Sequence, residues 1–157
     1  MPNPGIGIHA GVGELAAVLF LWTFVELFRG VDRTNVTRVR RIAFAALGLL
    51  ALAWIVGGSH YLSGYQQIEG TIVDGPQPWS HLVVMEVKEH LFFFLPPLAL
   101  LQTMGLRSRE TVTGDARYAL LVVTGLLVLT TFAMGGMGYL VSSGLRAATG
   151  PALLGGV

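Results

Sequence analysis

Four long apolar segments constrain the fold of this chain more than any other feature. They cover about residues 8–29, 41–63, 79–104 and 117–143. Each is long enough to cross roughly 30 Å of hydrocarbon at about 1.5 Å per residue. Only 12% of the residues are charged, about half the fraction usual in a soluble domain, which favours lipid as the main solvent. The pattern predicts an all-α integral membrane protein with four transmembrane helices, in a single domain over residues 1–157.

The distribution of arginine between the connections predicts the orientation of the helices. Arg29 and the connections 30–41 and 105–117 contain eight of the ten basic residues, whereas the connection 64–78 contains none. The positive-inside rule then predicts that 30–41 and 105–117 are cytoplasmic and that 64–78 and both termini lie on the outer side. Because short connections make successive helices neighbours, we expect an antiparallel four-helix bundle, in a plasma membrane of prokaryotic type.

Composition and motifs exclude several other classes. The absence of cysteine excludes disulfides and thiolate metal sites. The arginines lie mainly in two short connections and form no continuous basic face, so no nucleic-acid partner is expected. The sequence contains no G-x-S-x-G, P-loop or H-E-x-x-H motif. The N-terminus lacks a basic region and a small-residue cleavage site, so the first apolar run is expected to be retained as a helix.

The third segment begins with residues that are unusual in a membrane helix. Positions 81–90 contain two histidines, two glutamates, a lysine and a methionine. A charged side chain at bilayer depth costs about 2.5–3.5 kcal/mol on insertion scales, so a metal, a proton path or ion pairs must offset it. At about 100° per residue, an apolar arc is expected to face lipid, while Glu86, Glu89 and His90 converge on the bundle interior.

The leading hypothesis is a transition-metal site in the outer half of the bundle, used for redox chemistry or metal handling. Carboxylate and imidazole donors suit iron, manganese or zinc, or copper where histidines dominate. Glu14 lies at a similar predicted depth on the first segment and is the expected companion from a second helix. The candidate ligands are Glu14, Glu86, Glu89, His90, His81 and His9.

A b-type cytochrome that transfers electrons to an external redox partner is the first alternative. Haem b needs two axial ligands on different helices at matching depth. His60 with His81, or His9 with His81, satisfies this requirement, and a deeper haem would need Met134. The neighbouring glutamates argue against it, because a haem pocket has no need of them.

A proton path, or a structural subunit of a larger membrane complex, is the second alternative. Glutamate and histidine side chains together with a lysine are the materials of proton relays. Glu26 is the one acidic residue predicted in the inner half, which argues against a complete path. In the purely structural version the charges neutralise one another, for example through a pair between Glu14 and Lys88.

Overall fold

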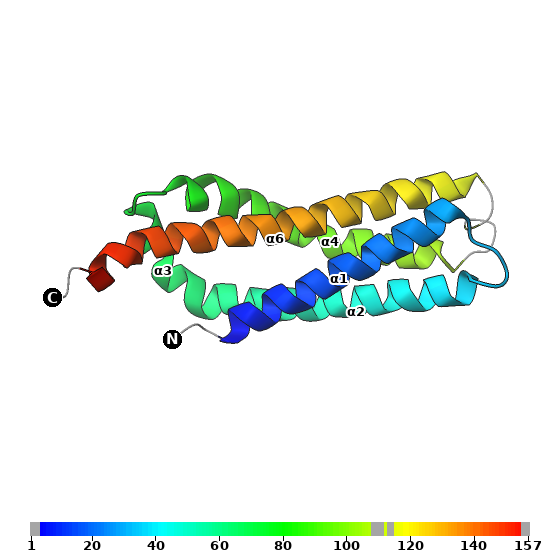
Figure 1. Ribbon diagram of the computed structural model, residues 1–157, viewed down its shortest axis with the longest axis horizontal. Helices are drawn as coiled ribbons and strands as arrows, with labels where there is room; N and C mark the ends of the chain where they lie inside the picture. The colour runs from blue at the N-terminus through cyan, green and yellow to red at the C-terminus, as the bar shows by residue number, and fades with distance from the viewer. Residues whose placement is uncertain (1–3, 108–111, 113–114, 155–157) are drawn as a thin grey trace.

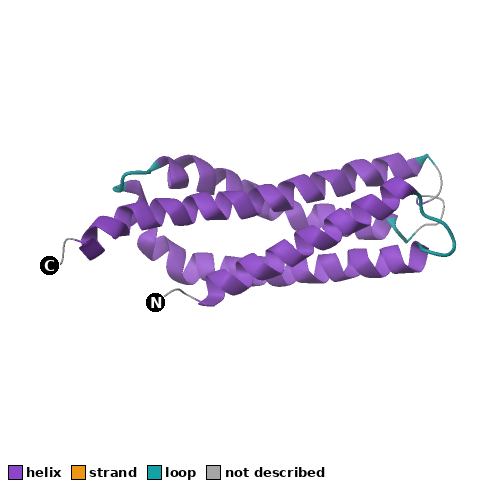
Figure 2. Cartoon of the chain, in the orientation of Figure 1, coloured by secondary structure: helices purple, strands orange, loops and turns teal. Residues whose placement is uncertain are grey.

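The regular structure of this protein is helical throughout the described part of the chain (Figures 1 and 2). The computed structural model describes residues 4–107, 112 and 115–154, and it has no strand within them. Two short π-helical turns are η1 (Tyr61–Tyr65) and η2 (Ser80–Met85). The α-helices are α1 (Pro4–Arg29), α2 (Val36–His60), α3 (Gln66–Val73), α4 (Glu86–Gly105) and α6 (Ala116–Leu154).

These elements join into four rods that pack side by side (Figure 1). The second rod consists of α2, η1 and α3 without interruption, and the third consists of η2 and α4. Each rod contacts its two neighbours in the cyclic order α1, second rod, third rod, α6. Among the described residues, three rods are long and apolar enough to cross a membrane: α1, the second rod and α6. The third rod is not among them, and it carries Glu86, Lys88 and Glu89 near its start.

Two helices extend further than the sequence predicted. The prediction that 64–78 is a loop was wrong for its first part, because the second rod continues as far as Val73. Tyr65 and Ile72 from this extension are buried in a hydrophobic cluster, which stabilises the helix beyond the predicted boundary. The restriction that proline imposes on backbone conformation begins only at Pro76. At the other end of the chain, α6 continues past the predicted end at 143 to Leu154.

The turn between α1 and α2 is held by backbone and side-chain hydrogen bonds. Gly30 adopts a φ of 107°, a left-handed conformation that glycine tolerates, and α1 ends there. The Asp32 carboxylate accepts hydrogen bonds from the Thr34 hydroxyl, the Thr34 N–H and the Asn35 N–H, at 2.6, 2.7 and 3.2 Å. These bonds, led by the one from the Thr34 hydroxyl, hold the pKa of Asp32 below its usual value.

Arginines tie the rods together at this end of the bundle, which we call the arginine end. Arg38 donates to both carboxylate oxygens of Glu26 at 2.9 Å, and Trp22 donates to the same carboxylate at 3.1 Å. Arg40 donates to the backbone carbonyl of Leu106 at 2.6 Å, which fastens the third rod to the second. Glu26 is therefore engaged in a surface ion pair. The predicted connection 105–117 falls partly outside the described residues.

Three hydrophobic clusters follow one another along the bundle. The arginine-end cluster contains Leu27, Val31, Val39, Ala43, Leu106, Val112 and Leu120. The middle cluster contains Ala16, Phe20, Ala46, Leu50, Leu95, Ala99 and Leu127. The termini cluster, named for the end where α1 begins and α6 ends, contains Tyr65, Ile72, Met85 and Val141. The middle cluster draws on all four rods, so it forms an apolar barrier between the two ends.

Candidate functional site

A group of polar side chains lies between the middle cluster and the termini end. Its members come from α1, the second rod and the third rod, and several of them interact across rods. We call this group the polar layer: His9, His60, Tyr61, Tyr65, Glu69, His81, Lys88 and Glu89.

His81 is the best-defined member of the polar layer. It is 5% exposed, its Nδ1 lies 2.8 Å from the Tyr65 hydroxyl, and its Nε2 lies 3.2 Å from a Glu69 carboxylate oxygen. An ionised carboxylate can only accept, so Nε2 carries the hydrogen that is donated to Glu69. In the neutral ring Nδ1 therefore accepts from Tyr65. The Glu69 side chain is 41% exposed, so this triad connects a buried imidazole with the surface.

Tyr61 and Glu89 continue the polar layer towards the middle cluster. The Tyr61 ring stacks on Tyr65 with 5.5 Å between centroids, and its hydroxyl faces the Glu89 carboxylate. Oxygen Oε1 of Glu89 is buried and has no hydrogen-bond partner among the described residues. A buried polar atom in this state has lost water without gaining a donor, which costs about 1–3 kcal/mol. A proton, a water or a cation at this oxygen would remove that cost.

His9 joins the polar layer from α1. Its Nδ1 lies 2.8 Å from the carbonyl oxygen of Ala53, so Nδ1 is the donor. The ring rests on Gly57, where a Cβ would stand 2.5 Å from its Cε1. The absence of a side chain at Gly57 therefore allows α1 and α2 to approach closely enough for this hydrogen bond.

Trp54 and Phe92 connect the second and third rods next to the polar layer. Their rings stack at 5.0 Å, and the Trp54 N–H donates to the carbonyl of Phe92 at 3.0 Å. Phe92 also lies 3.5 Å from the Cβ position of Gly58. These contacts fix the positions of Lys88 and Glu89, which lie one turn before Phe92 on the third rod.

The predicted convergence of Glu86, Glu89 and His90 does not occur. Glu86 and His90 are exposed, and His90 Nδ1 bonds to the backbone carbonyl of Glu86 at 2.7 Å. The buried face of the third rod runs instead through positions such as His81, Met85 and Leu95. All three residues lie in α4, after η2, and at 100° per residue Glu86 and His90 share a face with the exposed Phe93. The prediction was wrong because it took the polar half of this helix as the inward face, whereas large apolar side chains lie on the exposed face too.

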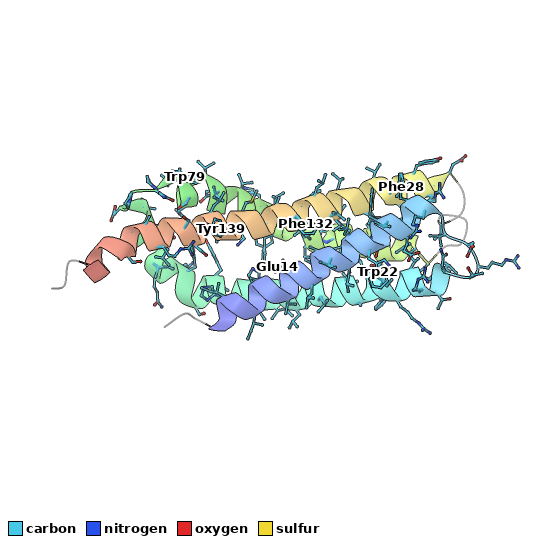
Figure 3. The ribbon with its side chains drawn as sticks, in the orientation of Figure 1. Glu14, Trp22, Phe28, Trp79, Phe132 and Tyr139 are labelled. Atoms are coloured by element: carbon cyan, nitrogen blue, oxygen red, sulfur yellow. The ribbon has the colours of Figure 1, made fainter. Side chains whose placement is uncertain are left out.

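Glu14 was predicted to accompany these ligands from α1, and it lies elsewhere. Its side chain is exposed along α1 (Figure 3). It borders a shallow groove on that helix, whose other lining residues are Gly7, Ile8, Gly11, Val12, Leu15 and Val18. The ion pairs of the described residues are Arg38–Glu26 and His81–Glu69, so the expected pair of Glu14 and Lys88 is not formed.

The residues predicted as haem ligands do not form a pair of free axial ligands in the structure. Both ring nitrogens of His81 are engaged, which leaves neither free for iron as placed. His60 is half-buried near the start of η1, with its ring 3.3 Å from the Cβ position of Gly64. Met134 packs against the middle cluster. Among the described residues, no three His, Asp or Glu side chains are grouped so as to hold a metal ion.

Sequence reasoning missed Tyr61, Tyr65 and Glu69 because it placed them at a helix end or in a loop. They follow one another at intervals of four, which puts them on one face of a continuous helix. This spacing is the signal that would have identified them.

Comparison with models of protein families, with curated proteins and with solved structures finds no match.

Proposed function

We propose that this chain spans the membrane four times and exchanges protons with the side that holds its termini. The third rod, Ser80–Gly105, has 26 residues and reaches about 39 Å at 1.5 Å per residue, which suffices for a span. Its neighbours on both sides are apolar enough to cross a membrane. The arginine end is assigned to the cytoplasm by the positive-inside rule.

The observation that carries the proton function is the chain of contacts from Glu69 through His81 to Tyr65. Histidine releases and binds protons near neutral pH, and Glu69 is within reach of solvent. For a proton that leaves, Nε2 passes its hydrogen to Glu69 while Nδ1 takes the Tyr65 hydroxyl hydrogen. The Tyr65 oxygen regains a proton from within the bundle, and Glu69 releases one to water, so one proton enters the chain for each that leaves.

Glu89 is the proposed inner end of this path. Its unpartnered oxygen lies in the same layer as Tyr61, whose ring stacks on Tyr65. Beyond Glu89 the middle cluster presents only apolar side chains, and these oppose proton movement. The proposal is therefore a half-path that loads and unloads protons from one side. A further membrane subunit would have to supply the other half.

Infrared difference spectroscopy after a pH jump, on protein in lipid vesicles, tests the assignment. Wild type should show a change in a carboxyl C=O band that is lost in Glu89→Gln and retained in Glu86→Gln. The second variant is a matched control, because Glu86 is on the same rod and exposed. His81→Phe should keep the band but slow its appearance at least tenfold. A Glu89→Gln spectrum identical to that of wild type would overturn the proposal.

Metal binding remains a second proposal. It is supported by the carboxylate and imidazole of Glu69 and His81, which lie 3.2 Å apart with Glu89 in the same layer. These groups suit iron, manganese, zinc or copper. Elemental analysis of protein from metal-replete medium, and a search for a Soret band in the same sample, test the metal and haem hypotheses. Stoichiometric metal that is lost in His81→Ala would favour metal binding over proton exchange.

A further inference from the structure

The outward face of α1 has features that the packing of this chain does not explain. One side of α1 packs against the second rod and α6, and the opposite side remains open. Exposed residues on the open side recur at alternating intervals of four and three, the spacing of a seam between two paired helices. We call this side the α1 seam: Gly7, Gly11, Glu14, Val18, Leu21 and Val25.

Glu14 is the charged residue of the α1 seam (Figure 3). It lies about 15 Å from the start of α1 and about 22 Å from its end, at 1.5 Å per residue. Among the described residues its carboxyl group forms neither an ion pair nor a hydrogen bond. No lysine or arginine lies one turn before or after it. A carboxyl group that faces lipid at this depth without a partner is costly, so its partner has to come from outside the chain.

Gly7 and Gly11 lie on the α1 seam in the turns before Glu14. A Cβ at either position would meet no atom within 4 Å, whereas a Cβ at Gly57 would clash with His9. Glycine weakens a helix relative to alanine, and no neighbour within the chain requires it at these two positions. Glycine on a membrane helix allows a second helix to approach closely. The groove that these glycines line together with Glu14 has a volume of about 550 Å³ and therefore fits a helix of another molecule.

We propose that α1 pairs in parallel with α1 of a second copy of this chain, about a two-fold axis along the membrane normal. Copies of one chain insert with the same orientation, so this axis places Glu14 opposite its counterpart at the same depth. A protonated carboxyl group donates one hydrogen bond and accepts another. Two carboxyl groups that share one or two protons therefore satisfy each other, and no residue of another kind is needed.

The residues beside Glu14 allow this contact. Gly11 and Val18, one turn before and one turn after it, are small, so they do not hold the two carboxyl groups apart. The interface rests on the proposed membrane span of α1, but it uses no residue of the polar layer. Its failure would therefore leave the proton path in place. Retention of the chain in vesicles after extraction with alkaline carbonate tests the span separately.

Oxidative cross-linking in lipid vesicles at a low ratio of protein to lipid tests the pairing. The chain has no cysteine, so a single introduced cysteine reports on one position. Val18→Cys should form disulfide dimers at least fivefold faster than Leu129→Cys. Leu129 is a matched control for random collision, because it is 70% exposed on α6 and follows Leu127, which packs in the middle cluster with Phe20.

Second substitutions in the Val18→Cys chain test the role of the carboxyl group. Glu14→Leu should slow cross-linking at least fivefold, whereas Glu14→Gln should stay within twofold, because an amide also donates and accepts. Gly11→Leu should slow it at least fivefold by blocking close approach. Glu86→Leu, at an exposed glutamate of the third rod, should have no effect. Cross-linking no faster than in Leu129→Cys, as expected if a different protein with a basic side chain occupies the seam, would overturn the proposal. Cross-linking that persists in both Glu14→Leu and Gly11→Leu would also overturn it.

Discussion

Buried polar side chains at the two ends of the bundle find their partners in different ways. In the middle and at the arginine end, Thr103, Thr124 and Thr131 donate to carbonyls four residues back in their own helices, at 2.7–2.8 Å. Gln102 adds one contact between rods, a 3.0 Å hydrogen bond to Thr124. In the polar layer, by contrast, His81 bonds to Tyr65 and Glu69 on another rod, and His9 bonds to Ala53.

This difference has a physical consequence for what each region can do. A threonine that is satisfied within its own helix needs no neighbour, so the rods around it can pack as apolar surfaces. Side chains that are satisfied between rods depend on the positions of those rods, and they are free to exchange partners with water or a ligand. Hydrogen bonds within one helix therefore suit an apolar barrier. Hydrogen bonds between rods suit a site that exchanges protons or binds a ligand.

The largest expected effect on stability comes from removing a large side chain of the middle cluster. Phe20 is fully buried in the middle cluster, whereas Phe28, two turns later on α1, is 70% exposed. Phe20→Ala should lower the free energy of unfolding by about 3–5 kcal/mol, because it removes buried contacts and leaves a cavity. Phe28→Ala should change it by less than about 0.5 kcal/mol. Equilibrium unfolding in mixed micelles measures both free energies. Equal losses would show that Phe20 in the middle cluster contributes no more to stability than the exposed Phe28.

A smaller effect should separate the two histidines of the third rod. His81→Ala leaves Tyr65 and Glu69 without their partner, and it should cost about 1–3 kcal/mol. His90 is exposed and bonds only to a carbonyl of its own helix, so His90→Ala should stay within about 0.5 kcal/mol. The same unfolding assay tests the pair. A greater loss in His90→Ala would contradict the placement of the polar layer.

The helical class and the number of rods followed from the apolar segments, but the composition of the site did not. Segment length and apolar character are local properties, so the sequence alone predicts them. The orientation of Glu86 and His90 was not predicted because their face of α4 also carries exposed apolar side chains such as Phe93, so the apolar pattern does not mark which face is buried. Glu69 was missed for a related reason, because the burial of Tyr65 and Ile72 against other rods extends its helix.

The smallest expected effect lies in the turn between α1 and α2. Since hydrogen bonds hold the pKa of Asp32 below its ordinary 3.8, its contribution to stability is fully present above that value. The contribution is lost as the pH falls through the lowered pKa of the folded state. The difference in Tm between wild type and Asp32→Asn should therefore be constant near neutral pH and shrink below about pH 4. Thermal unfolding from pH 7 to pH 3 measures it, and a difference that grows with acidity would contradict the assignment.

The π turn η2 also determines how the third rod tolerates a change in length. Ser80–Met85 contains the extra residue of a π turn, so a deletion of one residue there would allow the third rod to close as an ordinary α-helix. Everything before the deletion would then rotate by about 100° relative to α4. His81 would turn away from Tyr65 although every side chain of the polar layer was still present. The geometry of the polar layer therefore depends on the number of residues in this helical turn as well as on their chemical identity.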